Sequence, residues 1–161
     1  MKILAALFFF GIFAWGLDSR DLILGSLERS AELQREGRFT EAETVLRAAL
    51  KEAEHSKDSE NLGLTLSYLG NLLYRLPGRA DEARASLSRA IRVWISAGDE
   101  PNPRLIRTAR DLIAIFRESG DASSADRFWT KVLQPMLRRV KYDTVVVPVV
   151  PAAMTWACAG G

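Results

Sequence analysis

The stretch LTLSYLGNLLYRLPGRADEARASLSRA, residues 64–90, decides the fold. It contains two helical patterns separated by a Pro and a Gly, and the second pattern carries Ala, a large residue and Ala on one face. The same register occurs three times, each time after a Gly (Gly37, Gly78 and Gly120), and its copies lie 41 and 42 residues apart. The three registers are Ala42, Leu46 and Ala49; Ala83, Leu87 and Ala90; and Ala125, Trp129 and Val132. Because such a repeat buries its apolar face against its neighbours, the sequence predicts stacked helix pairs with an exposed inner surface.

Length and composition set the outer limits. A chain of 161 residues with 48% hydrophobic and 26% charged residues is large enough for one core and one domain. Its 22 Lys and Arg against 20 Asp and Glu give a net charge of only +2, which argues against a nucleic-acid partner.

The N-terminal residues 1–16 have the pattern of an export signal. Lys2 provides a short basic start, residues 3–17 are uncharged and rich in Leu, Ile and Phe, and small residues at 14 and 16 suit cleavage after Gly16. The alternatives are an uncleaved membrane anchor and a buried first helix, but a bilayer span needs about 20 apolar residues. We therefore expect an exported protein, periplasmic or secreted, which contacts a membrane only if this segment is not removed.

Helical periodicity and capping signals run through the rest of the chain. Thr40 followed by Glu43 predicts a capping box, and Asn102 before Pro103 predicts another helix start, as does Asp121 or Ser123. The three repeat glycines are expected where helices end, because Gly enters the left-handed conformation without steric cost. The predicted helices cover residues 19–36, 40–55, 59–76, 80–97, 103–119 and 123–140.

These residues resemble the tetratricopeptide repeat (TPR). The second repeat matches that pattern best, the third is similar, and the first matches in its second helix. The matching residues, all expected to pack between helices, are Ala42, Leu46, Ala49, Leu66, Leu69, Gly70, Leu73, Ala83, Leu87, Ala90, Leu112, Phe116, Ala125 and Trp129. The period of roughly 42 residues resembles the long repeats of kinesin light chains and their bacterial relatives, although it also falls in the range of HEAT and armadillo repeats. The resemblance implies an all-α, right-handed superhelix of about three helix pairs over residues 17–142.

The resemblance also implies a concave groove lined by the first helix of each pair. The expected groove residues are Gln34, Arg35, Ser67, Asn71, Tyr74, Arg75, Arg107, Arg110 and Arg117, and the groove would change from apolar to basic along its length. Arg107 and Arg110 would clamp a carboxylate of a bound peptide, with Asn71 holding its backbone. The alternative for each Arg is a solvated helix face, and Tyr74 could equally be a packing residue.

The C-terminal residues 143–161 form a Val- and Pro-rich tail in which an extended chain is expected. This tail is expected either to cover the apolar end of the last repeat or to bind a partner protein. Pro135 is expected to separate the last helix from a capping segment at residues 136–142. Cys158 is the only Cys and His55 the only His, so neither an internal disulfide nor a Cys and His metal site is expected.

The sequence therefore predicts a non-enzymatic protein of the bacterial cell envelope. It contains no nucleophile motif, no Gly-rich phosphate loop and no cofactor signature. The expected function is that of a scaffold that binds a partner peptide in its groove. The alternative is a structural subunit or oligomerisation module, including a homo-oligomer, that docks through its apolar end faces and its tail.

Overall fold

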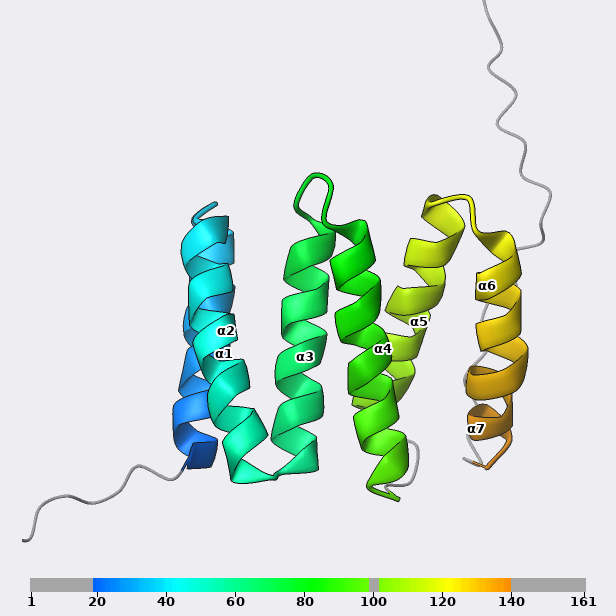
Figure 1. The fold of residues 1–161 in the computed structure, drawn as a ribbon, viewed down its shortest axis with the longest axis horizontal. Coiled ribbons are helices and arrows are strands. Elements are labelled where there is room, and N and C mark those ends of the chain that lie inside the picture. Colours follow the sequence, from blue (N-terminus) through cyan, green and yellow to red (C-terminus); the bar gives the residue numbers. More distant parts are fainter. Residues whose placement is uncertain (1–18, 99–101, 140–161) are drawn as a thin grey trace, which may run out of the picture.

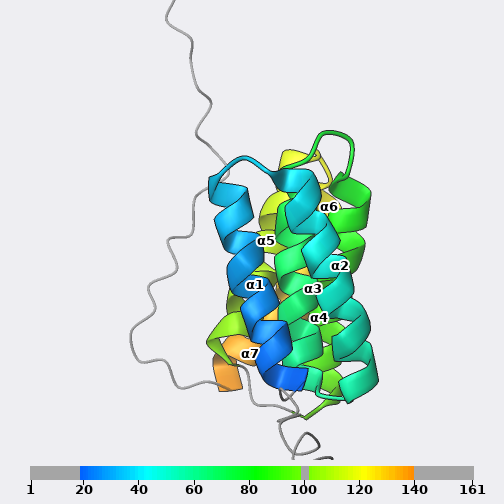
Figure 2. The same cartoon turned by 90° about the vertical axis from the view of Figure 1, so that its left-hand side faces the viewer.

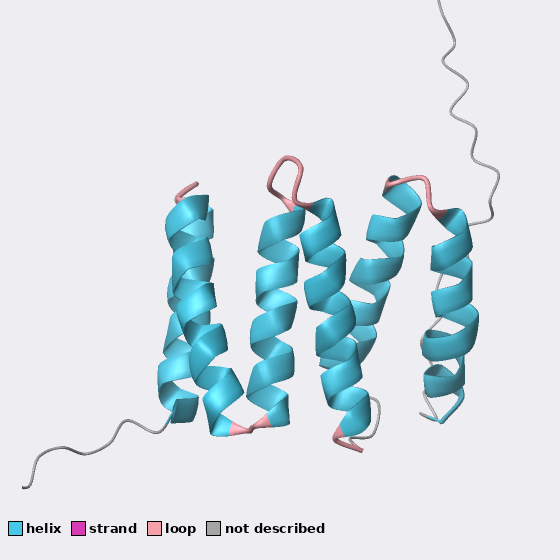
Figure 3. Cartoon of the chain, viewed as in Figure 1, coloured by secondary structure: helices cyan, strands magenta, loops and turns pink. Residues whose placement is uncertain are grey.

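The computed structural model describes residues 19–98 and 102–139, and every regular element in these ranges is helical (Figures 1 and 3). The elements are α1 (Ser19–Arg35), α2 (Phe39–Ser56), α3 (Ser59–Tyr74), α4 (Ala80–Ser96), α5 (Pro103–Glu118), α6 (Ala122–Phe128), the π-helical turn η1 (Trp129–Leu133) and α7 (Gln134–Arg139). Figure 1 shows them standing side by side as successive up-and-down helices. The prediction of an all-α solenoid of helix pairs is confirmed.

The first helices of the pairs form one layer of the stack. Helix α3 packs against both α1 and α5 in addition to its partner α4, so α1, α3 and α5 are neighbours along the stack. Viewed along the stack, α1 and α5 lie on one side and α2 and α6 on the other (Figure 2). The layer of first helices therefore presents one continuous face.

The predicted helix ends at the repeat glycines are confirmed. Gly37, Gly78 and Gly120 have φ of 78°, 74° and 78°, in the left-handed region. After two of them a backbone N–H reaches back into the helix: Arg38 donates to the Leu33 carbonyl at 2.8 Å, and Asp121 donates to the Phe116 carbonyl at 2.9 Å. These bonds satisfy carbonyls that the ending helix would leave open.

Two of the predicted helix starts are confirmed, and the capping box is wrong. The Asn102 side chain accepts from the Leu105 N–H, and the Asp121 side chain accepts from the Ser124 N–H. Helix α2 instead begins at Phe39 without a side-chain cap, which places Thr40 inside its first turn. Glu43, the partner expected for the box, instead pairs through its carboxylate with Arg47 and Arg79.

The segment around Pro135 also differs from the prediction. Pro135 does not separate the last helix from a capping segment, since it lies inside α7 and the helix continues through η1. A Pro inside a helix cannot donate to the carbonyl four residues before it and crowds that carbonyl. The π turn that precedes it accommodates this, with the Gln134 N–H donating to the Trp129 carbonyl five residues back.

The helix pairs approach closely where small residues face a neighbour. Ala42, Ala83 and Ala125 are fully buried at the start of the second helices. A Cβ placed on Gly70 would lie 2.7 Å from Cγ of Leu87, and a Cβ on Gly63 would lie 2.4 Å from Cε2 of the Trp94 indole. Both glycines therefore set the distance between α3 and α4, because interiors packed to this density have no room for an added methyl group.

Most residues predicted to pack between helices are buried. Phe116 and Trp129 are only half-buried, although both pack against the core, and the outer face of the Phe116 ring lies under the guanidinium of Arg84 at 5.8 Å. The buried ones are Ala42, Leu46, Ala49, Leu66, Leu69, Gly70, Leu73, Ala83, Leu87, Ala90, Leu112 and Ala125.

The predicted signal segment, residues 1–16, and the Val- and Pro-rich tail, residues 143–161, lie outside the described residues. Within the described ranges, no helix combines the length and the apolar character that crossing a membrane requires.

Candidate functional site

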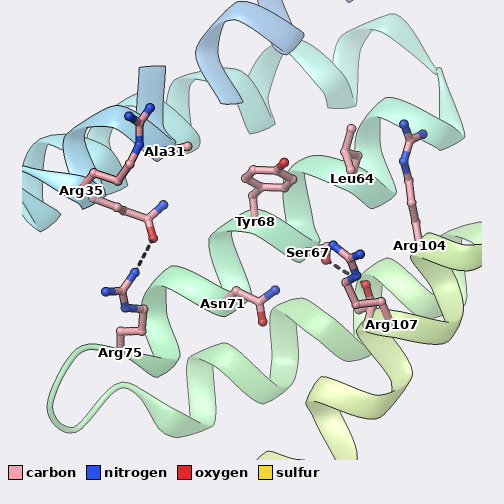
Figure 4. A pocket seen from close by; sticks show the side chains of 11 residues that line it. Ala31, Arg35, Leu64, Ser67, Tyr68, Asn71, Arg75, Arg104 and Arg107 are labelled. Atoms are coloured by element: carbon pink, nitrogen blue, oxygen red, sulfur yellow. Dashed lines mark hydrogen bonds between the residues drawn. The ribbon is translucent and has the colours of Figure 1, made fainter. Parts of the chain in front are cut away.

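A groove of about 490 Å³ crosses the face formed by α1, α3 and α5 (Figure 4). It runs from the C-terminal ends of α1 and α3 toward the N-terminal half of α5. Its lining residues are Ala31, Gln34 and Arg35 from α1; Leu64, Ser67, Tyr68, Asn71 and Arg75 from α3 and its C-cap; and Arg104, Arg107 and Thr108 from α5.

Polar contacts between α3 and α5 build the floor of the groove. The hydroxyls of Ser67 and Thr108, both buried, lie 2.8 Å apart and share a hydrogen bond. One turn further along α3, the Asn71 amide donates to the Asp111 carboxylate at 3.3 Å. These bonds join the second repeat to the third and fix the rotation of α5 against α3. The Asn71 amide N–H that was expected to hold a peptide backbone thus already donates a hydrogen bond within the protein.

Two arginines stand at the end of the groove near the C-termini of α1 and α3. The Arg75 guanidinium donates to the Gln34 side-chain carbonyl at 3.3 Å and lies over the Phe39 ring, 5.2 Å from its centroid. These contacts orient Arg75 without neutralising it. Arg35 is exposed, and within the described ranges its guanidinium pairs with no carboxylate.

Two further arginines stand at the opposite end, on α5. Arg104 pairs with Glu60 of α3. Arg107, one turn further along, is exposed and has no carboxylate partner among the described residues. Between the two ends, Tyr68 leaves 39% of its surface exposed, one of the few large hydrophobic side chains to do so in the described part of the chain.

The charge of the groove therefore differs from the expected gradient. The groove does not change from apolar to basic, since arginines lie at both ends and an aromatic ring lies in the middle. Its lining includes four arginines and no acidic residue. An anion entering it would meet positive charge at either end.

The structure brings together six of the nine predicted groove residues: Gln34, Arg35, Ser67, Asn71, Arg75 and Arg107. The other three do not line it. Tyr74 packs its ring against the core clusters on both sides of α3. Arg110 and Arg117 are exposed outside the groove, because the face of α5 that meets α3 is the one carrying Arg104, Thr108 and Asp111.

Sequence reasoning missed five lining residues: Ala31, Leu64, Tyr68, Arg104 and Thr108. Helical spacing contains a signal for some of them. Arg104 precedes Arg107 by three residues and Tyr68 precedes Asn71 by three, so each lies on the same helix face as a residue that was identified. The arginines that α5 contributes to the groove are thus Arg104 and Arg107 rather than Arg107 and Arg110.

A separate ionic network connects the second helices of the first two pairs. Glu43 and Arg47 of α2 pair with each other and, respectively, with Arg79 and Glu82 at the start of α4. Hydrogen bonds from Arg47 and Arg79 hold the pKa of the Glu82 carboxyl below its usual value. This network lies among the second helices, so it couples the two repeats away from the groove.

Comparisons with known proteins agree with the architecture. No protein-family model matches the sequence, and no curated protein matches it either. Among solved structures, the chain is similar to the TPR domain of Arabidopsis FLU, with a TM-score of 0.62 and 19% sequence identity. The match covers 76% of this chain and 97% of that domain. At this level of identity the likeness concerns the fold, and the chain has a TPR-like fold.

Proposed function

We propose that this protein is a non-enzymatic interaction scaffold that holds a segment of a partner protein in the groove formed by α1, α3 and α5. The observation that carries the proposal is an exposed aromatic residue, Tyr68, placed between two arginines, Arg35 and Arg107, that have no carboxylate partner in the described part of the chain. If these side chains only kept the surface soluble, they would not need to line one common groove. Exposed aromatic and Arg side chains are the types that contribute most at interfaces.

The groove is also of a kind that an extended peptide can occupy. Its floor is joined by the Ser67 and Thr108 hydroxyls, so the surface is held in place before a partner arrives. A preformed surface lowers the entropic cost of association. Its walls come from three successive repeats, which is the usual arrangement of a binding face in a stacked helical scaffold.

The test is crosslinking and co-purification of the full chain, tagged before residue 143, from cells that naturally produce it. Arg35→Glu combined with Arg107→Glu reverses one unpaired positive charge at each end of the groove. The matched control is Arg110→Glu combined with Arg117→Glu, which makes the same change in net charge on exposed helix positions outside the groove.

A partner lost in the groove variant and kept in the control variant would support the proposal. Equal retention in both variants would overturn it and would favour docking through the end faces of the stack and the tail, as a structural subunit or oligomerisation module. Circular dichroism of both variants would establish that the helices are intact.

We further propose that the chain works in the bacterial cell envelope after export and that its repeats are of the long, kinesin-light-chain type. Support for export is the uncharged, apolar segment at residues 3–17 behind Lys2. Support for long repeats is the hydrogen bonding of Ser67 to Thr108 and of Gln34 to Arg75, each pair 41 residues apart. Cell fractionation with N-terminal sequencing tests export: a mature chain beginning at residue 17 is expected, and an intact N-terminus in the cytoplasm would contradict it.

A further inference from the structure

We propose that residues 145–150, a Val-rich segment of this same chain, pack in an extended conformation against the last helix pair and cover the apolar side of α6, η1 and α7. The segment would take the place that a following helix would have in a longer stack. None of the residues involved lines the groove, so this docking surface is separate from the one in the proposed function.

The second helix of the last pair is less well covered than its counterparts. Three positions can be compared across the repeats: Leu46, Leu87 and Trp129; Ala49, Ala90 and Val132; and Ala53, Trp94 and Met136. The six residues of the first two pairs are all buried, whereas the three residues of the last pair are half-buried. Apolar surface therefore remains in contact with water at positions that belong to the packed face of the repeat.

The difference follows from the element that comes next along the chain. Helix α2 packs against the following α3, and α4 packs against the following α5. In both cases the chain turns at the end of the second helix and runs back beside it (Figure 1). Helix α7 ends at the same side of the stack as α2 and α4, and no described element follows it. The chain thus leaves the described residues where the covering helix begins in the earlier pairs.

Segment 145–150 has the composition and the length that this surface requires. It consists of five Val and Pro148 and carries no charge. From Ala125 to Met136 the helical surface is about 17 Å long, at roughly 1.5 Å per residue. An extended chain advances about 3.3 Å per residue, so the segment spans a similar length. Residues 140–144 remain as the connection.

The residues of the segment favour an extended chain over a further helix. Pro148 and Pro151 cannot donate helical backbone hydrogen bonds, and the residue before each Pro is biased toward extended backbone. Alternate side chains of an extended chain point to opposite sides, so one row of Val side chains would face the helices. The backbone would stay at the surface, where water satisfies its N–H and C=O groups.

Charge argues against a second copy of the chain as the cover. Residues 102–139 contain eight Lys and Arg against four Asp and Glu, whereas residues 19–98 contain twelve of each. Two copies that met through this end would bring their positive charges close together, which costs free energy. The uncharged segment 145–150 reaches the surface without this repulsion.

Disulfide trapping on the full chain tests the proposal. In a Cys158→Ser background, Val132→Cys is combined with Val146→Cys or with Val147→Cys, one from each side of an extended chain, because a disulfide forms only between residues in contact. Ala48→Cys replaces Val132→Cys in the matched control, since Ala48 is exposed on α2 at the other end of the stack.

We expect a disulfide within the monomer for at least one Val132 pair and none for the control, seen on a non-reducing gel. Equal yields for the Val132 pairs and the control, or no disulfide in either Val132 pair, would overturn the proposal. A disulfide that links two chains would also overturn it, because the segment would then cover another copy.

Hydrogen exchange provides a second measurement without new cysteines. Val146→Asp combined with Val147→Asp should release the segment, because a charge is not buried without a partner. Amides of residues 125–136 should then exchange at least about tenfold faster, while those of α2 are unchanged. Ala152→Asp combined with Ala153→Asp is the control with the same added charge, and equal exchange in the two variants would contradict the proposal.

Discussion

Replacing Gly63 by Ala should destabilise the protein, although Ala is the better helix former. Gly63 lies inside α3, where a Cβ would come within 2.4 to 2.8 Å of three atoms of the Trp94 indole. The indole is fully buried and rigid, so it cannot move aside as a flexible side chain could. Either the ring or the helix must shift.

The magnitude follows from two opposing effects. The change from Gly to Ala within a helix gains about 1 kcal/mol of stability from the backbone. Overpacking a core costs typically 1 to 3 kcal/mol, and the upper part of that range applies roughly to a clash with a buried ring. The free energy of unfolding should therefore fall by about 1 to 2 kcal/mol.

Gly25→Ala is the matched control, because Gly25 is exposed within α1 and an added Cβ would meet nothing within 4 Å. This variant should gain about 0.5 to 1 kcal/mol. Urea unfolding followed by circular dichroism measures both, with the same denaturant slope expected for each. If Gly63→Ala were stabilised as much as Gly25→Ala, the close approach of α3 and α4 at Trp94 would be refuted.

The remaining predictions concern a helix cap and an ionic network. Asp58→Ala should lower the free energy of unfolding by about 1 kcal/mol, because the Asp58 carboxylate accepts hydrogen bonds from two N–H groups at the start of α3. Thr40→Ala is the control and should be nearly neutral, because Thr40 forms no capping box. Thermal unfolding of both variants measures the difference. The Glu82 carboxyl has a pKa held below its unfolded value of about 4.3 by Arg47 and Arg79, so its contribution is fully present above that pH and is lost as the pH falls through the folded-state pKa. The difference in stability between the wild type and Glu82→Gln should therefore shrink between pH 5 and pH 3, and a constant difference would contradict the pairing.

The sequence was sufficient to predict the fold because its signals are local and repeated. The three glycines end helices because Gly adopts the left-handed conformation without steric cost. The three alanines at the start of the second helices indicate that another helix packs closely there, whichever helix that is. Asn102 and Asp121 cap helices through side-chain bonds that reach only three residues along the chain. Such signals can be read without knowledge of the rest of the structure.

The groove was predicted only in part because its composition depends on how one helix rotates against another. Arg104 and Arg110 are both three residues from Arg107, and nothing local decides which of them faces α3. The bond between Ser67 and Thr108, which are 41 residues apart, decides it. The same holds for Tyr74, since only the packing of α3 against both neighbouring pairs shows that its ring lies against the core rather than in the groove.

If the function proposed above holds, the face formed by α1, α3 and α5 is the surface that contacts the partner. Photocrosslinking inside intact cells is the test, with p-benzoylphenylalanine in place of Tyr68 in the groove and, separately, in place of Arg110, which is exposed on α5 outside the groove. We expect a defined crosslinked partner from the groove position and none from position 110. The same partner from both positions, or crosslinks only from position 110, would contradict it.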